Sequence, residues 1–229
     1  MDVFFPRHCP VCDRLLPMGK GVHPACALKW KRITGPTCLR CGKALSGSYK
    51  DEEFCEDCKR RRHFFDRGIA VFPYRSIASS LYRFKYEGRQ EYAAYFGQEI
   101  FLHCASFLAQ IRPDALIPVP MYEKKRRSRG YNQAALLARE VSKRSGIPMK
   151  DHLVIRVKNT APQKQMDAHR RRQNLKNAFF LRESVVELKC VVIIDDIYTT
   201  GSTMDALATL LKANGVHRVY AVSLSIGTL

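Results

Sequence analysis

The chain has 229 residues, long enough to bury a substantial core, and its 46% hydrophobic and 26% charged content is typical of a folded globular protein. No apolar run reaches the roughly 18 residues of a membrane span and no secretory signal precedes the first cysteine, so we expect a cytoplasmic protein. The formal net charge is +18, and residues 121–182 hold 17 lysines and arginines against 4 acidic residues. Basic charge concentrated in one segment predicts a polyanionic partner, either nucleic acid or a phosphorylated small molecule.

Seven of the nine cysteines lie before residue 59. Structural disulfides are rare in the cytoplasm, so these thiols need another explanation. Six of them form pairs separated by two residues, and Cys26 has the same spacing from His23. This spacing turns two ligands toward one tetrahedral metal ion. The sequence therefore predicts closed structural zinc sites, with ligands grouped as Cys9, Cys12, His23 and Cys26, and as Cys38, Cys41, Cys55 and Cys58.

The two ligand groups differ in composition. Four thiolates in a reducing compartment have few uses other than metal binding, whereas the first group needs His23 in place of a fourth cysteine. His8 is an alternative ligand that lacks the spacing, and a cross-braced grouping of the pairs also fits, so the sequence leaves one or two Zn²⁺ ions open. Because bound metal stabilises a segment too small for its own core, we expect a double zinc ribbon domain over residues 1–65.

The second predicted domain, residues 66–229, alternates strands with helices. Proline and glycine mark several boundaries, such as Gly88 within a helical region and Gly146 after a helix. The expected strands are 68–74, 115–120, 191–194 and 217–225, and the expected helices lie within 76–110, 131–145 and 201–213. This order predicts an α/β fold with a parallel sheet flanked by helices, whose ligands bind beyond the carboxyl ends of the strands.

Residues 191–203, VVIIDDIYTTGST, place an acidic pair after the most apolar strand. The turn that follows consists of Thr199, Thr200, Gly201, Ser202 and Thr203. Its hydroxyls and the free N–H groups of the next helix form a cradle for phosphate. Carboxylates repel phosphate but accept hydrogen bonds from vicinal hydroxyls and bind divalent cations. Since the P-loop and dinucleotide fingerprints are absent, the pattern predicts a ligand that carries a sugar diol near a phosphate.

The same thirteen residues resemble the phosphoribosyl-pyrophosphate (PRPP) signature of type I phosphoribosyltransferases. The resemblance implies that Asp195 and Asp196 bind the ribose hydroxyls at the catalytic centre, and that residues 199–203 hold the 5-phosphate. Enzymes of this class that act on 6-oxopurines carry an aspartate where this chain has Thr199. A purine acceptor is therefore disfavoured.

Three further stretches are similar to the ComF/GntX family: IPVP at 117–120, KKRRSRGYNQAALLA at 124–138 and the basic residues 163–180. Members carry an N-terminal double zinc ribbon before a type I phosphoribosyltransferase core. The resemblance implies a role in natural transformation, in the uptake or handling of single-stranded DNA, with a ComFA-like helicase or translocase as a partner in some bacteria. The alternative is an active phosphoribosyltransferase on an unidentified, non-purine acceptor.

In transfer from PRPP, pyrophosphate leaves C1 of the ribose, and Mg²⁺ and basic side chains stabilise the departing charge. Two clusters fit either this role or contact with nucleic acid: Lys124, Lys125, Arg126, Arg127 and Arg129 in a loop after IPVP, and Lys164, Arg170, Arg171 and Arg172 in a loop over the site. Composition does not separate the two uses, nor binding of PRPP from its turnover.

Aromatic residues near these clusters have two interpretations. Phe84, Tyr86 and Tyr131 are able to stack on nucleic-acid bases. Aromatic residues at helical spacing more often belong to the core. Cys104 and Cys190 are interpreted as small buried apolar residues without a catalytic role.

Overall fold

The structure is a computed structural model, and it describes residues 7–45, 47, 52–157 and 178–227. Its centre is a four-stranded sheet in the order β1-β6-β5-β2. The strands are β1 (Arg67–Pro73), β2 (Ala115–Pro118), β5 (Cys190–Tyr198) and β6 (Arg218–Ile226). Every neighbouring pair is parallel, which confirms the predicted sheet.

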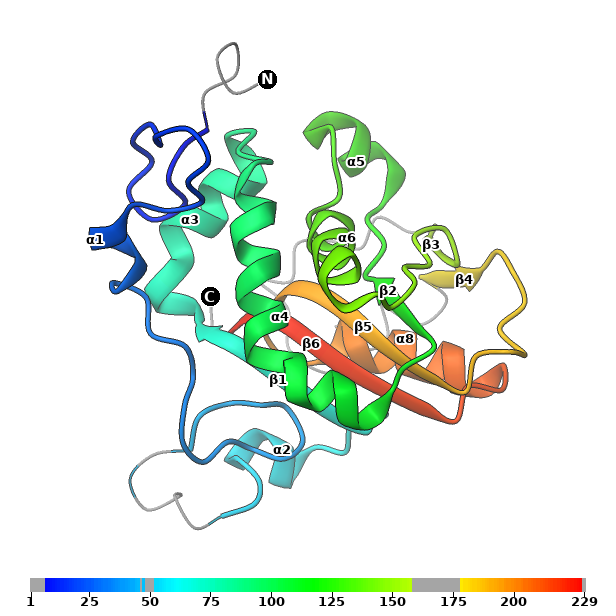
Figure 1. Cartoon of the computed structure of the whole chain (residues 1–229). Coiled ribbons are helices and arrows are strands. Elements are labelled where there is room, and N and C mark those ends of the chain that lie inside the picture. Colours follow the sequence, from blue (N-terminus) through cyan, green and yellow to red (C-terminus); the bar gives the residue numbers. More distant parts are fainter. Residues whose placement is uncertain (1–6, 46, 48–51, 158–177, 228–229) are drawn as a thin grey trace.

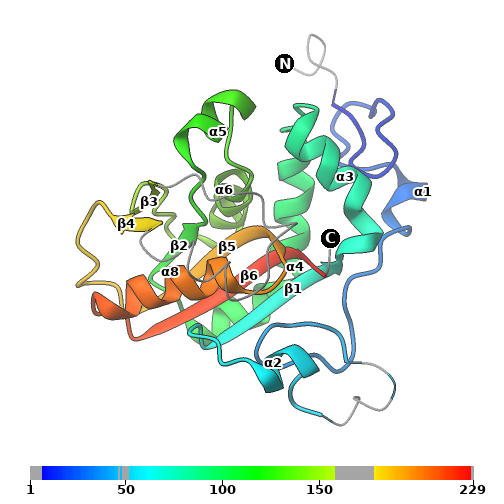
Figure 2. The same cartoon turned by 180° about the vertical axis from the view of Figure 1, so that it is seen from behind.

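Helices cover both faces of this sheet (Figures 1 and 2). One face packs on α3 (Tyr74–Tyr86), α4 (Tyr92–Ile111) and α6 (Gln133–Ser145), and the other packs on α8 (Ser202–Ala213). The apolar segment 190–194 is buried because its side chains alternate between these two helix layers. The carboxyl ends of β2 and β5 therefore lie at the edge of the sheet between the two helix layers.

Three smaller elements surround that opening. The strands β3 (Val154–Arg156) and β4 (Phe179–Leu181) form an antiparallel hairpin, and α5 (Glu123–Arg129) follows β2. The predicted loop over 124–129 was wrong. Glu123 forms ion pairs with Arg126 and Arg127, three and four residues later, and Gly130 ends the resulting helix with φ +84°.

The strand after Cys190 is also longer than predicted. The sequence placed its end at Ile194, but β5 continues to Tyr198, so that Asp195 and Asp196 lie within the strand. Pairing with the long strand β6 extends it, because Asp195 pairs with Ser223 and Ile197 pairs with Ser225. The predicted domain boundary at residue 65 stays a prediction.

The cysteine-rich region lies against the core in two places (Figure 1). Residues 7–30, which we call the first ribbon half, include α1 (Pro24–Ala27) and pack beside α3 and α4. Residues 31–60, the second ribbon half, include α2 (Glu56–Arg60) and pack along β1, where Ile33 N donates to Val71 O and Gly68 N donates to Arg40 O. Its buried cysteines belong to the same apolar cluster as α8.

Candidate functional site

The acidic pair is held in β5 with its two side chains on opposite sides of the strand, as alternation requires. Asp196 N donates to Asp195 Oδ1 at 2.9 Å, and Ser225 Oγ of β6 donates to Asp196 O at 3.1 Å. On the α3 side, Asp196 Oδ2 lies 2.7 Å from Lys85 Nζ. On the hairpin side, the charge of Asp195 acts on Arg156 of β3. Lys85 thus pairs with Asp196 and also acts on Asp195, whose second basic neighbour is Arg156.

A cavity of about 480 Å³ opens at this end of the sheet, and we call it the sheet-end cavity. Four of the seven predicted PRPP-binding residues line it, namely Asp195, Asp196, Thr199 and Thr203, whereas Thr200, Gly201 and Ser202 do not. Its basic lining residues are Lys85, Lys125, Arg129 and Arg156. Carboxylates and cations therefore line one open cavity, which suits a ligand with both hydroxyl and phosphate groups.

The crowding of charged groups in the cavity shifts the pKa values of two of its residues. Burial, reinforced by the charge of Asp196, raises the pKa of Asp195 well above its ordinary value. Burial and the nearby charges of Arg156 and Arg129 lower the pKa of Lys125. An anion beside Lys125 and a cation or diol beside Asp195 would relieve both effects. The two pKa shifts therefore suit a ligand that carries an anionic group together with hydroxyl groups or a bound cation.

The loop of residues 199–203 connects β5 to α8. Gly201 has φ +75°, a left-handed conformation that favours glycine, and α8 begins at the next residue. A Cβ atom at Gly201 would meet the Tyr198 hydroxyl and would lie 2.8 Å from His63 Cε1. Thr200 Oγ1 and Ser202 Oγ lie 2.9 Å apart, so these two hydroxyls fix the turn. Glycine is therefore required by both the turn and its packing.

The segment that follows the second ribbon half supports this loop from behind. Arg61 Nη1 donates to Thr200 O at 3.0 Å. Asp205, in the first turn of α8, accepts from His63 Nδ1 at 2.9 Å and from Phe64 N at 2.8 Å. The other ring nitrogen of His63 lies 3.3 Å from the Tyr198 hydroxyl. These contacts connect the cysteine-rich region directly to the base of the 199–203 loop.

The basic residues predicted after IPVP divide into groups. Lys125 and Arg129 line the sheet-end cavity, and Arg129 Nη1 donates to Gln133 Oε1 at 2.6 Å. Arg126 and Arg127 are held by Glu123, and Lys124 is exposed on α5. The predicted residues Lys164, Arg170, Arg171 and Arg172 lie outside the described residues.

A second cavity of about 660 Å³ lies beside α5, α6 and the hairpin, and we call it the hairpin cavity. It shares Pro120, Met121, Asn132 and Arg156 with the sheet-end cavity. The side chains of Arg126, Arg139 and Arg182 add positive charge to its wall. The two cavities therefore adjoin at Arg156, and the hairpin cavity adds three arginines beside Glu123 and Asp151.

The predicted metal ligands meet in two clusters, grouped in sequence order. Within each cluster, the four ligand atoms lie within 4.8 Å of one another. The sulfur atoms of Cys41 and Cys55 lie 3.8 Å apart, as expected for two thiolates on one tetrahedral zinc ion. Cross-bracing is therefore wrong for this chain, and both donor sets fit structural zinc.

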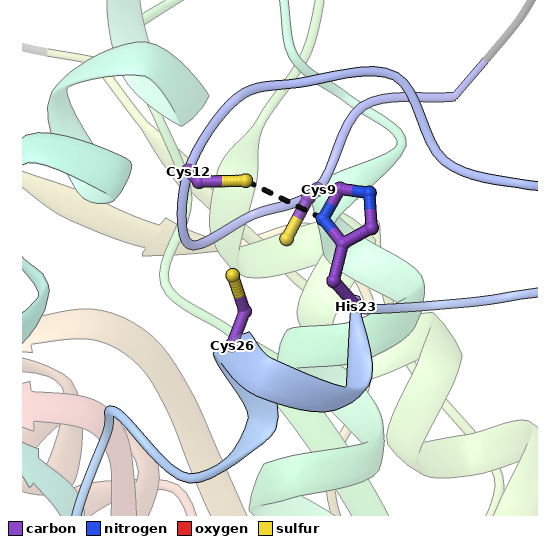
Figure 3. A group of neighbouring side chains, drawn as sticks. All are labelled: Cys9, Cys12, His23 and Cys26. Atoms are coloured by element: carbon purple, nitrogen blue, oxygen red, sulfur yellow. Dashed lines mark hydrogen bonds between the residues drawn. The ribbon is translucent and has the colours of Figure 1, made fainter.

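His23 is oriented as a metal ligand in the first cluster (Figure 3). Its Nδ1 lies 3.4 Å from Cys12 Sγ, while Nε2 donates to Leu15 O at 2.9 Å. A carbonyl partner on the second ring nitrogen keeps the first nitrogen free for metal. His8 points elsewhere, because its Nδ1 lies 3.4 Å from Glu91 Oε1. His23, the ligand predicted from the spacing, therefore joins the cluster, and the alternative, His8, does not.

Comparison with known proteins agrees with this architecture. A family model described as a double zinc ribbon domain matches residues 1–59, and one described as a phosphoribosyl transferase domain matches residues 127–225. Together with the parallel sheet, these matches define the class: a phosphoribosyltransferase-like α/β protein with an N-terminal double zinc ribbon.

Three similar proteins indicate the family within this class to which the chain belongs. Competence protein F of Haemophilus influenzae is 33% identical, over 94% of this chain and 95% of that protein. The DNA utilization protein YhgH of Escherichia coli K12 is 31% identical, over 93% and 94% of the two chains. Competence protein ComFC of Bacillus subtilis is 29% identical, over 83% and 78%. The chain belongs to the ComF family of competence proteins.

Several site residues were not predicted from the sequence. No local pattern assigned a role to Lys85, yet it pairs with Asp196. Arg156 and the supporting residues His63 and Asp205 were not considered. Each acts across a long separation in the chain, so no local spacing indicated it.

Within the described residues, no helix is long and apolar enough to cross a membrane.

Proposed function

We propose that the sheet-end cavity binds PRPP, or a related ribose phosphate, together with Mg²⁺. The observation that carries the proposal is the convergence of Asp195, Asp196, Thr199 and Thr203 with Lys125, Arg129 and Arg156 in one cavity. The carboxylates accept from the ribose hydroxyls, the loop holds the 5-phosphate, and the basic wall holds the pyrophosphate. Mg²⁺ neutralises pyrophosphate charge when it is bound.

Isothermal titration of the whole protein with PRPP and Mg²⁺ tests this proposal. The wild type should bind, and Asp195→Ala/Asp196→Ala should lose most of the affinity. Glu187→Gln is the matched control, since Glu187 is exposed and does not line the cavity. Absence of binding by the wild type, or undiminished binding by the double variant, would contradict the proposal.

The second part of the proposal is a role in natural transformation, in the handling of single-stranded DNA. Relatives named for competence and DNA utilization support it, as does the charge of residues 121–182. The exposed Lys124 of α5 and the arginines of the hairpin cavity extend a basic surface beyond the ribose-phosphate residues. A ComFA-like translocase is the partner that this role would require for DNA movement.

Salt dependence distinguishes DNA contact from incidental charge. Affinity for oligothymidine should fall by about 0.7 log units per tenfold increase in salt for each phosphate neutralised. Replacing Arg170, Arg171 and Arg172 by alanine should reduce that slope, whereas replacing the exposed Lys20 and Lys31 of the ribbon should not. A slope that is flat, or unchanged in the arginine variant, would argue against DNA handling by this segment.

Catalytic turnover is the alternative use of the same cavity. The bond from ribose C1 to the pyrophosphate oxygen would break, with the electron pair leaving on pyrophosphate, while an acceptor nitrogen bonds to C1 and loses its proton. The position of Thr199, where purine enzymes carry an acid, favours a non-purine acceptor. Pyrophosphate release that depends on both PRPP and an added pyrimidine would establish this activity, and binding without release would exclude it for that acceptor.

A further inference from the structure

Helix α3 presents three different faces. Leu81 and Phe84 are buried in the core, and Lys85 reaches Asp196. Tyr82 and Tyr86 are one turn apart, so they share the third face, and they are 56% and 64% exposed. The stretch that contains Phe84 and Tyr86 thus serves two purposes, with one ring in the core and the other at the surface.

The two exposed tyrosines belong to the sheet-end cavity. Their ring centroids are 5.0 Å apart, with planes inclined by 47°. Arg129 Cζ lies 4.9 Å from the centroid of the Tyr86 ring, in cation–π geometry. Both rings line the same cavity as Asp195 and Asp196. An aromatic pair with a cation beside it therefore borders the space proposed for ribose and phosphate.

Single exposed aromatic residues are common on protein surfaces. This pair differs because two adjacent rings and an arginine side chain together suit a ligand with a flat ring and a phosphate. Its members touch each other, and the neighbouring Arg129 is a phosphate-binding type of side chain. A flat ring attached to, or about to join, C1 of a ribose needs an apolar face beside the sugar site. Tyrosine rings meet that need because stacking does not depend on the hydrogen-bonding edge of the base.

We propose that Tyr82 and Tyr86 form a stacking platform for a nucleobase at the rim of the sheet-end cavity. The inference rests on the proposed ribose-phosphate site and names what lies next to it. The base has two possible sources, a free base that serves as acceptor and a base within single-stranded DNA. Both present the same aromatic face to the two rings.

Quenching of a fluorescent base tests the platform, because the fluorescence of pyrrolocytosine falls when the base stacks. Two probes are titrated into the whole protein with Mg²⁺ and PRPP: free pyrrolocytosine base, and an oligothymidine of about ten residues that carries pyrrolocytosine at one end. The wild type should quench at least one probe. Quenching of the free base alone assigns the acceptor source, and quenching of the oligonucleotide alone assigns the DNA source.

Variants separate stacking from general surface effects. Tyr82→Ala/Tyr86→Ala should weaken binding of the quenched probe by about tenfold or more, whereas Tyr82→Phe/Tyr86→Phe should keep it. Leu102→Ala removes an equally exposed apolar side chain from α4 and should change nothing. Calorimetric affinity for PRPP with Mg²⁺ should fall less than probe affinity in the double alanine variant, because Tyr86 touches Arg129 of the basic wall whereas stacking acts on the base.

The outcomes distinguish this inference from the proposed function. Full probe affinity in the double alanine variant, or no quenching of either probe by a wild type that binds PRPP, would overturn the platform alone. Failure of the wild type to bind PRPP would overturn the proposed function. Quenching that still depends on Tyr82 and Tyr86 in that case would uphold the platform as a base-binding site.

Discussion

The two ribbon halves carry the same kind of ligand cluster but attach to the core differently. The first half is held by Asp13, which pairs with Arg89 Nε at 2.9 Å and accepts from Tyr92 of α4. The second half leads into residues 61–65, where Arg61 and His63 reach the 199–203 loop and Asp205. One cluster therefore fixes the outer surface of α3 and α4, and the other supports the base of the candidate ligand site.

The second cluster is placed to affect the candidate ligand site without lining the sheet-end cavity. The second cluster shares a buried apolar core with α8, including Phe65 and Leu207, so its collapse would remove packing under the loop. The first cluster lies outside that core. Damage to the two clusters should therefore have unequal effects on ligand affinity, even though each would lose one ion.

Loss of a zinc ligand should give the largest effect. Cys58→Ser should release one zinc ion and lower the affinity for PRPP by about 100-fold or more, because metal-dependent folding of this half supports the loop. Cys12→Ser should also release one ion but keep the affinity within about threefold, because its cluster lies away from the loop. Native mass spectrometry counts the ions, and calorimetry measures the affinity. Equal losses of affinity would break the comparison between the halves.

A methyl group at Gly201 should give the next largest effect. Gly201→Ala meets both the left-handed strain and the Tyr198 hydroxyl, so we expect a loss of about 2–4 kcal/mol in stability and at least tenfold weaker PRPP binding. Gly146→Ala is the matched control, with φ +73° and nothing within 4 Å of the added Cβ. It should cost only the strain, about 1 kcal/mol, and leave PRPP binding intact. Denaturant unfolding and calorimetry check both variants.

Neutralising one aspartate at each attachment, Asp13 in the first ribbon half and Asp205 in α8, tests the two attachments separately. Asp205→Asn weakens the contacts to His63 and Phe64, and Asp13→Asn weakens those to Arg89 and Tyr92. Each should lower the free energy of unfolding by about 1–3 kcal/mol, as expected for damaged buried hydrogen bonds. Only Asp205→Asn should also weaken PRPP binding, by roughly fivefold. A similar loss of affinity in Asp13→Asn would remove the distinction.

The smallest effect on stability is expected for the replacement of Asp195 in the cavity itself. The raised pKa of Asp195 means that the folded protein binds a proton that the unfolded chain releases, so stability falls as pH rises from the ordinary value, about 3.9, through the raised one. Asp195→Asn should remove that fall and increase the free energy of unfolding at pH 8 by about 1 kcal/mol, while losing PRPP binding. Urea unfolding across pH checks it. An unchanged pH profile would show that Asp195 is not strained.

Local patterns predicted much of the fold and part of the candidate site. The cysteine pairs and the run from Val191 to Thr203 were recognisable because their residues are adjacent in sequence. The grouping of the zinc ligands was left open, and the structure resolves it in sequence order. Sheet pairing extended β5 beyond Ile194, a tertiary effect that apolar periodicity does not contain.

The remaining site residues depend on contacts between distant segments. Lys85 meets Asp196 because α3 packs against the sheet, and Arg156 enters the cavity from a three-residue strand that has too little alternation to be predicted. Helix α5 was missed because its like charges indicated a loop, whereas Glu123 pairs with two of its arginines. Such partners become visible only when the chain is folded.

Hydrogen exchange of the whole protein, with and without PRPP and Mg²⁺, measures whether ligand binding reaches the segment beneath the 199–203 loop. The ligand should slow amide exchange in residues 199–203 and in the supporting segment 61–65, and leave residues 7–30 unchanged. Unchanged exchange in the 199–203 loop at saturating PRPP, or equal protection of both ribbon halves, would contradict this prediction.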